Sequence, residues 1–492
     1  MKIFNILILI SIVPLLGVIF LILIPGRYNF YCSNVALFVS SFTFFLSLIM
    51  WLTFDSGHNS FQFLYTIDWL PAFNFYYTAG VDGISLFFLI LTTFLIMVCI
   101  LISWGSIHYR IKEYLINFLL LEFLLIQVFS VLDLLLFYVF FESVLMPMFL
   151  IIGIWGSRER KIRAAYQFFL YTLVGSVLML LGILIIYSHG GTTDLQMLWN
   201  LELSEKKQIF LWVSFFLSFA VKIPMMPFHI WLPEAHAEAP TGGSVILAGI
   251  LLKMGAYGFL RFSLPMFPFA TIFFTPLIFV LSLVATIYAS LTTLRQVDLK
   301  KIIAYSSISH MGFVTIGIFT LNVQGLEGSI FLMLSHGLVS SALFFCVGIL
   351  YDRYHTRVIK YYGGLVQVMP IFSIFFLFFS FANIGFPGTS NFVGELLVLI
   401  GTFQSSFILT LLSGFSLVLG TAYSIWMFNR IMFGTLKLQY FTIFQDVSRR
   451  EYVILALIAF LILWMGIYPE VFLNEIHSSV FNLLEQSVYS QK

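Results

Sequence analysis

Long runs of apolar residues, separated by short polar breaks, fill most of the chain. A helix needs about 20 consecutive apolar residues to cross the hydrocarbon core of a bilayer, so the pattern predicts roughly fourteen transmembrane helices. Their approximate cores are residues 4–24, 30–53, 82–104, 113–131, 133–153, 166–187, 208–232, 241–262, 271–292, 301–320, 327–350, 370–401, 406–433 and 450–468. The predicted fold class is therefore an all-α, polytopic membrane protein.

The composition agrees with this prediction. Of the 492 residues, 61% are hydrophobic and only 9% are charged, far from the usage of soluble proteins. The net charge of +2 leaves no basic surplus for a nucleic-acid backbone, which excludes nucleic-acid partners. Cys32, Cys99 and Cys346 lie far apart in apolar runs, so we expect packing residues and neither a metal site nor a disulfide framework.

The lysines and arginines divide unevenly between the two ends of the predicted spans. Of the 24, 17 fall on one side and 5 on the other, while Lys222 and Lys253 fall inside spans. Loops on the cytoplasmic or matrix side carry the excess of cations. If one span had been miscounted, all later loops would change sides and the excess would disappear. We therefore expect an even number of helices, with both termini on the cation-poor side, the periplasm or intermembrane space.

Two predicted spans are broken by proline, at Pro224 and at Pro387, 163 positions apart. Proline removes a backbone donor and interrupts the helix. Adding the same offset to the cationic loop 158–163 gives a loop near residues 321–324, which has no cation. Loops at matching positions of the two repeats therefore lie on opposite sides of the membrane. We expect helices 1–3 in residues 1–112, two inverted five-helix repeats in 113–265 and 266–434, and helix 14 with a tail in 435–492. Paired broken helices in inverted repeats indicate an ion or substrate path near the midplane.

Four charged residues fall inside predicted spans: Glu142, Lys222, Lys253 and Glu395. A lone charge at the bilayer centre costs at least about 2.5–3.5 kcal/mol. A structural ion pair between Glu142 and Lys222 would explain two of the four. A proton relay would explain all of them, because burial and a mobile opposite charge act in opposite directions on the pKa of such a group.

Three histidines extend the series: His229, His310 and His336. Unperturbed imidazole titrates near about pH 6.5, so each can pass a proton at modest cost, although any one alone is as readily a satisfied core group. Ser306 and Ser340 each lie four residues from a histidine, on its helix face, where they can hold water. No pair of histidines has metal-ligand spacing, so we expect no metal site.

The sequence gives less support for a role of the other polar groups in the proton relay. Glu122 lies within an apolar run and is a possible member of the relay. Asp82 opens the third span and is expected to cap its helix. The acidic cluster 234–238 and the run 298–301 lie at span ends, where a solvated or interface role is expected.

Three long segments carry a family resemblance. They are residues 222–253 (KIPMMPFHIWLPEAHAEAPTGGSVILAGILLK), 302–312 (IIAYSSISHMG) and 385–395 (GFPGTSNFVGE). Together they resemble the antiporter-like subunits of respiratory complex I, and the resemblance extends from about the third to the thirteenth span. Glu395 is acidic where related subunits usually have lysine, and no long lateral helix follows the last span, so one paralogue among these subunits is favoured.

The resemblance implies a membrane-arm subunit of H⁺-translocating NADH:ubiquinone reductase, in which each inverted repeat holds half of a proton channel. If the family's residue roles are carried over to the matching positions, Glu142 and Lys222 form the pair that controls the first half-channel. Lys253 and His310 then connect the two half-channels, and Glu395 is the last proton site of the second. His229 and His336 would assist along this path. The resemblance also implies that NADH, FMN, iron–sulfur clusters and ubiquinone belong to partner subunits. This chain fits that division, since its sequence has no GxGxxG motif after a strand and no clustered cysteines. The expected partners are other complex I subunits, especially neighbouring antiporter-like ones, and lipids, in the mitochondrial inner membrane.

Two alternatives keep the fold and change the function. The first is a subunit of a multi-subunit cation/proton antiporter without redox partners, whose sequence motifs overlap with these. The second is a structural spacer that conducts nothing, in which apolar replacements of the buried charges would be neutral or stabilising.

Overall fold

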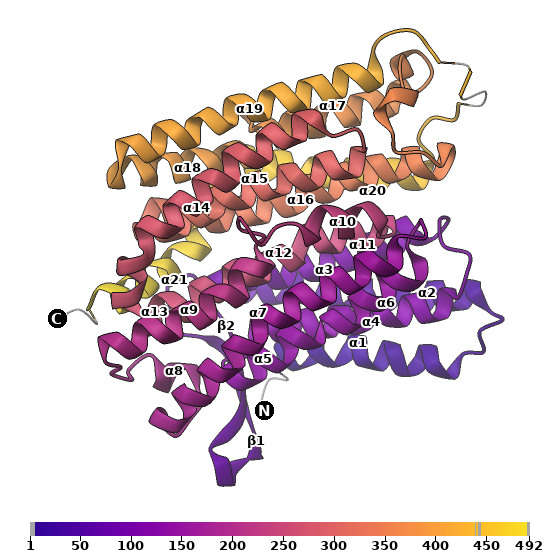
Figure 1. Ribbon diagram of the computed structural model, residues 1–492. Helices are drawn as coiled ribbons and strands as arrows, with labels where there is room; N and C mark the ends of the chain where they lie inside the picture. Colours follow the sequence, from indigo (N-terminus) through magenta and orange to yellow (C-terminus); the bar gives the residue numbers. More distant parts are fainter. Residues whose placement is uncertain (1–4, 438, 441–443, 490–492) are drawn as a thin grey trace. The chain divides into compact units, whose positions relative to one another are not determined.

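The structure is a computed structural model that describes residues 5–437, 439–440 and 444–489. It is almost entirely helical (Figure 1). Within the described residues, twelve helical segments are long and apolar enough to cross a membrane. Helix α9 and the shorter α17 and α18 occupy the other two predicted spans. The all-α polytopic prediction is confirmed, and the exact number of spans stays a prediction.

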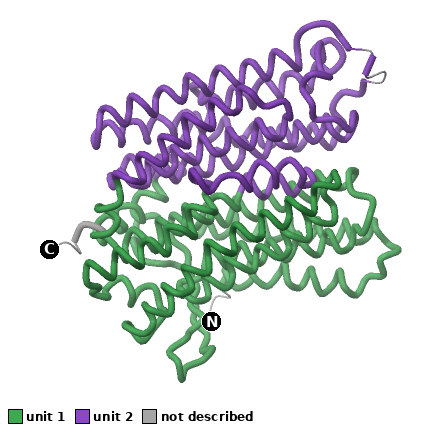
Figure 2. Tube along the Cα trace, in the orientation of Figure 1, with its two compact units in different colours: residues 1–223, 250–275, 474–492 green, residues 224–249, 276–473 purple. Residues whose placement is uncertain are grey.

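The chain divides into two compact units (Figure 2). Unit 1 comprises residues 1–223, 250–275 and 474–492, and unit 2 comprises residues 224–249 and 276–473. Both units combine segments that are distant in sequence. The predicted boundaries divide the chain into consecutive repeats and not into units that combine distant segments. These boundaries stay a prediction.

Unit 1 is built around α3, whose residues are mostly buried against α2 and α4. Its elements are α1 (Ile6–Leu23), α2 (Asn29–Leu52), β1 (Gln62–Leu70), a 3₁₀ turn (Pro71–Phe73), β2 (Phe75–Val81), α3 (Gly83–Ser103), α4 (Ile111–Ser130), α5 (Leu134–Ser143), α6 (Leu145–Trp155), α7 (Lys161–Gly190), α8 (Leu195–Leu198), α9 (Glu205–Lys222), α12 (Leu252–Gly258), a π-helical segment (Phe259–Ser263), α13 (Leu264–Met266) and most of α21 (Glu470–Tyr489).

Unit 2 is built around α16, which packs against α15, α17, α18 and α20. Its elements are α10 (Trp231–Glu238), α11 (Thr241–Ile246), most of α14 (Pro268–Arg295), α15 (Leu299–Phe319), α16 (Val323–Tyr354), 3₁₀ turns (Ile359–Tyr361 and Leu365–Gln367), α17 (Pro370–Ile384), α18 (Ser390–Ser405), α19 (Phe407–Met432) and α20 (Arg449–Ile467). A π-helical segment, Leu247–Leu251, continues from α11.

Both predicted helix breaks are present. Helix α9 ends at Lys222, and regular α-helix resumes only with α10 at Trp231. Helix α17 ends at Ile384, where Gly385 adopts φ +79°, and α18 begins at Ser390. Glycine suits this left-handed position because it has no Cβ. The prolines and the glycine therefore interrupt the two spans where the sequence predicts.

The hairpin β1–β2 in unit 1 is not predicted by the span pattern. The two antiparallel strands pair Thr66 with Thr78 and Gln62 with Val81. The tip residues are exposed and the end of β2 is buried. The strand sequences, QFLYTIDWL and FYYTAGV, are too short and too interrupted to be read as spans, and the hydropathy pattern alone does not show that they pair.

The amphipathic helix α21 occupies what the span pattern predicts only as a tail. Its Ser479 hydroxyl accepts a hydrogen bond from the Gly83 backbone at 2.9 Å, and Asn482 donates to the Asn59 carbonyl at 3.1 Å. A Cβ on Gly83 would overlap the backbone carbonyl of Glu475. The missing side chain at Gly83 thus lets α21 pack directly against the start of α3.

Candidate functional site

The first predicted pair, Glu142 and Lys222, lies in unit 1 on α5 and α9. Lys222 Nζ lies 3.5 Å from the carbonyl oxygen of Phe141 and 4.4 Å from the centre of its ring. The cation therefore faces both a carbonyl and an aromatic surface, each of which stabilises positive charge. Among the described residues, Glu142 and Lys222 form no direct ion pair, although the two charges interact electrostatically.

The carboxyl group of Glu142 is only partly satisfied. Its Oε1 is buried and has no hydrogen-bond partner within the described chain. Ser176, on α7, faces the same carboxyl group. Glu142 thus has an unused acceptor oxygen, and Lys222 lies near it but outside ion-pair distance. A small movement of either side chain would make or break the contact between their charges.

Lys253 is completely buried in α12, two residues after the π-helical segment Leu247–Leu251. Gly255, on the same short helix, packs directly against α9: a Cβ built there would lie 3.1 Å from Lys222 Cβ. The glycine therefore brings the backbones that carry Lys222 and Lys253 close together. π-helical turns within α-helices are frequent at functional sites.

Unit 2 holds the other predicted groups. His310 Nδ1 on α15 lies 3.2 Å from Glu395 Oε1 on α18, and both side chains are buried. His336 on α16 is buried beside them, with its ring centre 5.6 Å from that of His310. The structure thus brings together three groups that the sequence separates by 26 positions or more.

The histidine at the break of the seventh span, His229, lies elsewhere in unit 2. It is half-buried, with ring centres of Tyr288 and Tyr305 at 6.3 and 6.4 Å. Its Nδ1 is buried without a hydrogen-bond partner in the described chain. His229 is therefore not in the His310, His336 and Glu395 cluster.

The serines predicted to hold water donate to their own helices instead. Ser306 Oγ donates to the Ile303 carbonyl at 2.8 Å, and Ser340 Oγ to the His336 carbonyl at 2.6 Å. Their oxygen lone pairs remain available as acceptors. Tyr423 of α19, a residue that the sequence does not single out, is fully buried and interacts electrostatically with Glu395.

Glu122, the possible relay member, is completely buried on α4. One carboxyl oxygen accepts a hydrogen bond from Thr43 on α2, and the other has no partner among the described residues. This oxygen is polar and buried, so the group has capacity for one more proton or water.

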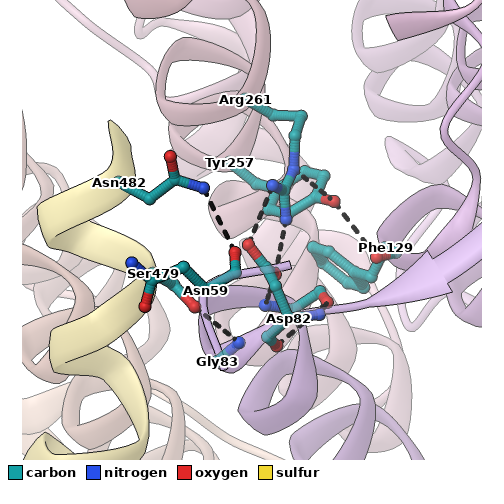
Figure 3. Close-up of polar contacts among 9 residues, drawn as sticks. Asn59, Asp82, Gly83, Phe129, Tyr257, Arg261, Ser479 and Asn482 are labelled. Atoms are coloured by element: carbon teal, nitrogen blue, oxygen red, sulfur yellow. Dashed lines mark hydrogen bonds and ion pairs between the residues drawn. The ribbon is translucent and has the colours of Figure 1, made fainter. Parts of the chain in front are cut away.

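The buried ion pair between Asp82 and Arg261 is not predicted by the sequence. The span pattern places Arg261 at the end of the predicted span 241–262, with the cations of the cation-poor side. Its guanidinium is buried and binds Asp82, with N–O distances of 2.6 and 2.9 Å (Figure 3). Arg261 also donates to the Tyr257 hydroxyl, which donates to the Phe129 carbonyl. Asp82 caps α3 as predicted. Burial alone would raise the pKa of Asp82, and the Arg261 charge lowers it below its ordinary value.

The span-end run 298–301 is more buried than predicted. Lys301 forms a half-exposed ion pair with Glu234 at 2.6 Å, which fits the expected interface role. Lys300, in contrast, is buried and donates to the Ala239 carbonyl at 2.7 Å. Arg357, which the span pattern places in a loop, is completely buried, with its Nε 3.9 Å from Asp298 Oδ2. These pairings join residues about 60 positions apart, which spacing alone does not reveal.

Cys32, Cys99 and Cys346 are all buried, as packing residues should be. Within the described ranges, no group of three or more histidine, cysteine, aspartate or glutamate side chains is placed to hold a metal ion.

Comparison with known proteins identifies the family. A family model described as "NADH:quinone oxidoreductase/Mrp antiporter, TM" matches residues 131–420. The protein named NADH-ubiquinone oxidoreductase chain 4 from Chondrus crispus is 71% identical over 485 residues, which cover 99% of each chain. The chain belongs to the NADH-ubiquinone oxidoreductase chain 4 family.

Other members of the chain 4 family agree. The protein of that name from Marchantia polymorpha is 59% identical and covers 97% of this chain and 96% of its own. The predicted resemblance is confirmed, and the paralogue that Glu395 favours is chain 4 of the plant or algal mitochondrial kind.

Solved structures share the fold of this chain 4 family member. A chain of respiratory complex I from Thermus thermophilus with bound NADH is 30% identical, with a TM-score of 0.88, and the match covers 97% of this chain and 99% of that one. A chain of the Mrp complex from Dietzia sp. DQ12-45-1b also has a TM-score of 0.88 but is 19% identical, covering 100% of this chain and 99% of that one. This second likeness shows the fold alone.

Proposed function

We propose that this chain is a proton-translocating subunit of the membrane arm of respiratory complex I, working in the mitochondrial inner membrane with both termini in the intermembrane space. Relatives named chain 4 and the likeness to a chain of the Thermus complex support this assignment. The observation that carries it is the set of titratable side chains buried within an otherwise apolar membrane protein. Such groups are costly in hydrocarbon and mark ion or proton pathways.

The first step in the proposed mechanism is a change in the contact between Glu142 and Lys222. Lys222 now rests against Phe141 and not in an ion pair with Glu142. When the carboxylate approaches, it favours the charged lysine, and when it withdraws, the buried lysine releases its proton more readily. The affinity of Lys222 for a proton thus depends on the position of Glu142.

The released proton would pass to Lys253, whose helix packs on α9 at Gly255. From there it would move to the cluster of His310, His336 and Glu395 in unit 2. A histidine 3.2 Å from a carboxylate can take up a proton and pass it to that carboxylate after a small movement of either side chain. His229 would assist at the break in span seven, and Glu122 is a further possible member.

Redox chemistry is assigned to partner subunits in this proposal. They would hold NADH, FMN, the iron–sulfur clusters and ubiquinone, and their reaction would move the Glu142–Lys222 contact. This chain would contribute only proton-carrying side chains and the water between them. Its nearest partners would be the neighbouring antiporter-like subunits.

The test is a pair of substitutions in the assembled complex, Glu142→Gln and Lys222→Ala. Both substitutions should lower two rates: proton pumping by the complex in vesicles and the coupled NADH:ubiquinone turnover. The amount of assembled complex should stay near that of the wild type. Glu159→Gln, a change at an exposed acid between α6 and α7, is the matched control and should leave both rates unchanged. Normal pumping in an assembled Glu142→Gln or Lys222→Ala complex would reject the proposal.

The family description names both NADH:quinone oxidoreductase and Mrp antiporter, so a subunit of a cation/proton antiporter is the second candidate function. Purification of the native chain separates the two. Flavin and iron–sulfur subunits should accompany it if the proposal is right, and small antiporter subunits if the alternative is right.

A further inference from the structure

Unit 2 contains a buried glutamate and a buried lysine that the proposed mechanism does not use. Lys300 Nζ, at the start of α15, donates to the Ala239 carbonyl at 2.7 Å and lies 3.5 Å from the Ser244 hydroxyl. Glu238, the last residue of α10, directly precedes Ala239 and is almost completely buried, as Lys300 is. The sequence places Glu238 in an acidic cluster that is expected to be solvated, so its burial is a departure from that expectation.

The contacts of Glu238 and Lys300 repeat those of Glu142 and Lys222 in unit 1. In each pair, the lysine Nζ approaches the backbone carbonyl of the residue next to the glutamate, at 3.5 Å for Lys222 and 2.7 Å for Lys300. One carboxyl oxygen of each glutamate is buried without a hydrogen-bond partner in the described chain, Oε1 of Glu142 and Oε2 of Glu238. Neither lysine forms an ion pair among the described residues, although each interacts electrostatically with its glutamate.

Three further charged groups interact electrostatically with Lys300: Asp298, Asp352 and Arg357. Asp298 caps α15, Asp352 lies near the end of α16 and is exposed, and Arg357 follows α16 and is buried. They lie where α14 and α16 end and α15 begins, which is the end of unit 2 that carries the excess of cations in the sequence (the cation-rich end). Lys301 is partly exposed, so solvent reaches the residue next to Lys300.

The helix that carries Lys300 also carries His310. The two residues are ten positions apart, which is about 15 Å along an α-helix. Ser307 lies seven residues after Lys300 and three before His310, so the three residues share one broad face of α15. Ser307 is buried, and its hydroxyl donates to the Ile303 carbonyl at 3.0 Å, which leaves its oxygen lone pairs to accept from water. Polar groups on α15 therefore extend from the cation-rich end toward the contact of His310 with Glu395.

We propose that Glu238 and Lys300 are a second proton-carrying pair, which exchanges protons between the cation-rich end of unit 2 and His310 through water along α15. A proton that moves from Lys300 Nζ to Glu238 Oε2 breaks an N–H bond and forms an O–H bond. Both groups are then neutral, which is the state that burial favours. The inference rests on the proposed function, since such a pair has a role only where the chain carries protons.

A purely structural role for Lys300 would be to satisfy the carbonyl of Ala239 at the end of α10. Helix ends leave such carbonyls without partners, and a lysine side chain is a common donor to them. That role needs a donor and a positive charge, but it does not need a group that releases a proton. Arginine keeps the donors and the charge and is not deprotonated in proteins, so Lys300→Arg separates the two roles.

The experiment compares matched substitutions in the intact complex in sealed vesicles. Lys300→Arg is paired with Lys301→Arg, and Glu238→Gln is paired with Glu234→Gln, because Lys301 and Glu234 form a half-exposed ion pair on the same two helices. We expect Lys300→Arg and Glu238→Gln each to lower the proton-pumping rate severalfold, with the amount of assembled complex near that of the wild type. The two control variants should pump at the wild-type rate.

Glu238→Gln keeps the size of the side chain but cannot take up a proton, and it decides the question if Lys300→Arg does not assemble. Normal pumping in an assembled Lys300→Arg or Glu238→Gln complex would overturn the inference. Glu142→Gln, measured in the same assay, separates this result from a failure of the proposed function. If Glu142→Gln pumps poorly while Glu238→Gln pumps normally, only the inference is wrong, and if both pump normally, the proposed function is wrong as well.

Discussion

His310 and Glu395 face each other within unit 2, with Nδ1 and Oε1 3.2 Å apart and both side chains buried. They come from α15 and α18, which are separated in sequence by the whole of α16. At this ion-pair distance, a small movement of either side chain lets a proton shift between the imidazole and the carboxylate. It is the closest contact between two of the proposed relay groups.

Replacement of Glu395 by Gln should therefore reduce pumping. The amide keeps the size of the side chain but cannot take up a proton, so we expect at least a severalfold lower pumping rate with normal assembly. Proton uptake by vesicles of the variant complex measures this. Glu234→Gln removes a half-exposed ion pair with Lys301 and should have little effect, and equal rates in the two variants would contradict the assigned role.

Gly385→Ala tests how Glu395 is positioned. Gly385 has φ +79°, and a Cβ there would overlap Glu395 Oε2. Gly388→Ala is a matched control, since Gly388 has φ +89° but nothing lies within 4 Å of the position that an added methyl group would occupy. Both changes cost about 1–2 kcal/mol of backbone strain, so thermal stability should fall similarly.

Only Gly385→Ala should also displace the carboxyl group. We expect pumping to fall several times further in Gly385→Ala than in Gly388→Ala when the rates are normalised to assembled complex. Equal normalised rates would show that the position of Glu395 does not matter for transport.

The buried pair of Asp82 and Arg261 should matter for stability. Asp82→Asn can still cap α3 but leaves the Arg261 charge buried without its partner, a loss of about 3–5 kcal/mol. A lower midpoint of thermal unfolding in detergent, with less assembled complex, is the expected result. Asp55→Asn, which affects an exposed pair with His58, should change the midpoint little.

The pH dependence of the Asp82 effect has a definite sign. The native pKa of Asp82 lies below its ordinary value of 3.8, so the stabilisation is complete above that value and disappears as the pH falls through the native pKa. The difference in unfolding midpoint between wild type and Asp82→Asn should be constant from about pH 8 to pH 5. A difference that changes across this range would contradict the ion-pair explanation.

Much of the fold follows from local properties of the sequence. Runs of apolar residues fix the spans, and Pro224 and Pro387 mark the two breaks because proline lacks a backbone donor. Lys222, Lys253, Glu142 and Glu395 stand out as candidate site residues because a charge in an apolar run is costly. These features need no knowledge of the three-dimensional partners.

The features that the sequence does not predict depend on partners distant along the chain. Asp82 and Arg261 are 179 positions apart, and Arg261 lies at the end of a predicted span, where a solvated cation is expected. Lys300 likewise looks like a solvated residue at a helix start until its bond to the Ala239 carbonyl is seen. The β1–β2 hairpin and the packing of α21 on Gly83 also depend on contacts that only the three-dimensional structure shows.

The central claim is that buried titratable groups of this chain carry protons, and Lys253→Met tests it most directly. Methionine fills a similar volume without a charge, so packing in α12 is retained. The measurement is the number of protons pumped per NADH oxidised by the variant complex in sealed vesicles. The proposal predicts a clear fall in that ratio or in coupled turnover, whereas an unchanged ratio at wild-type turnover would contradict it and favour a spacer.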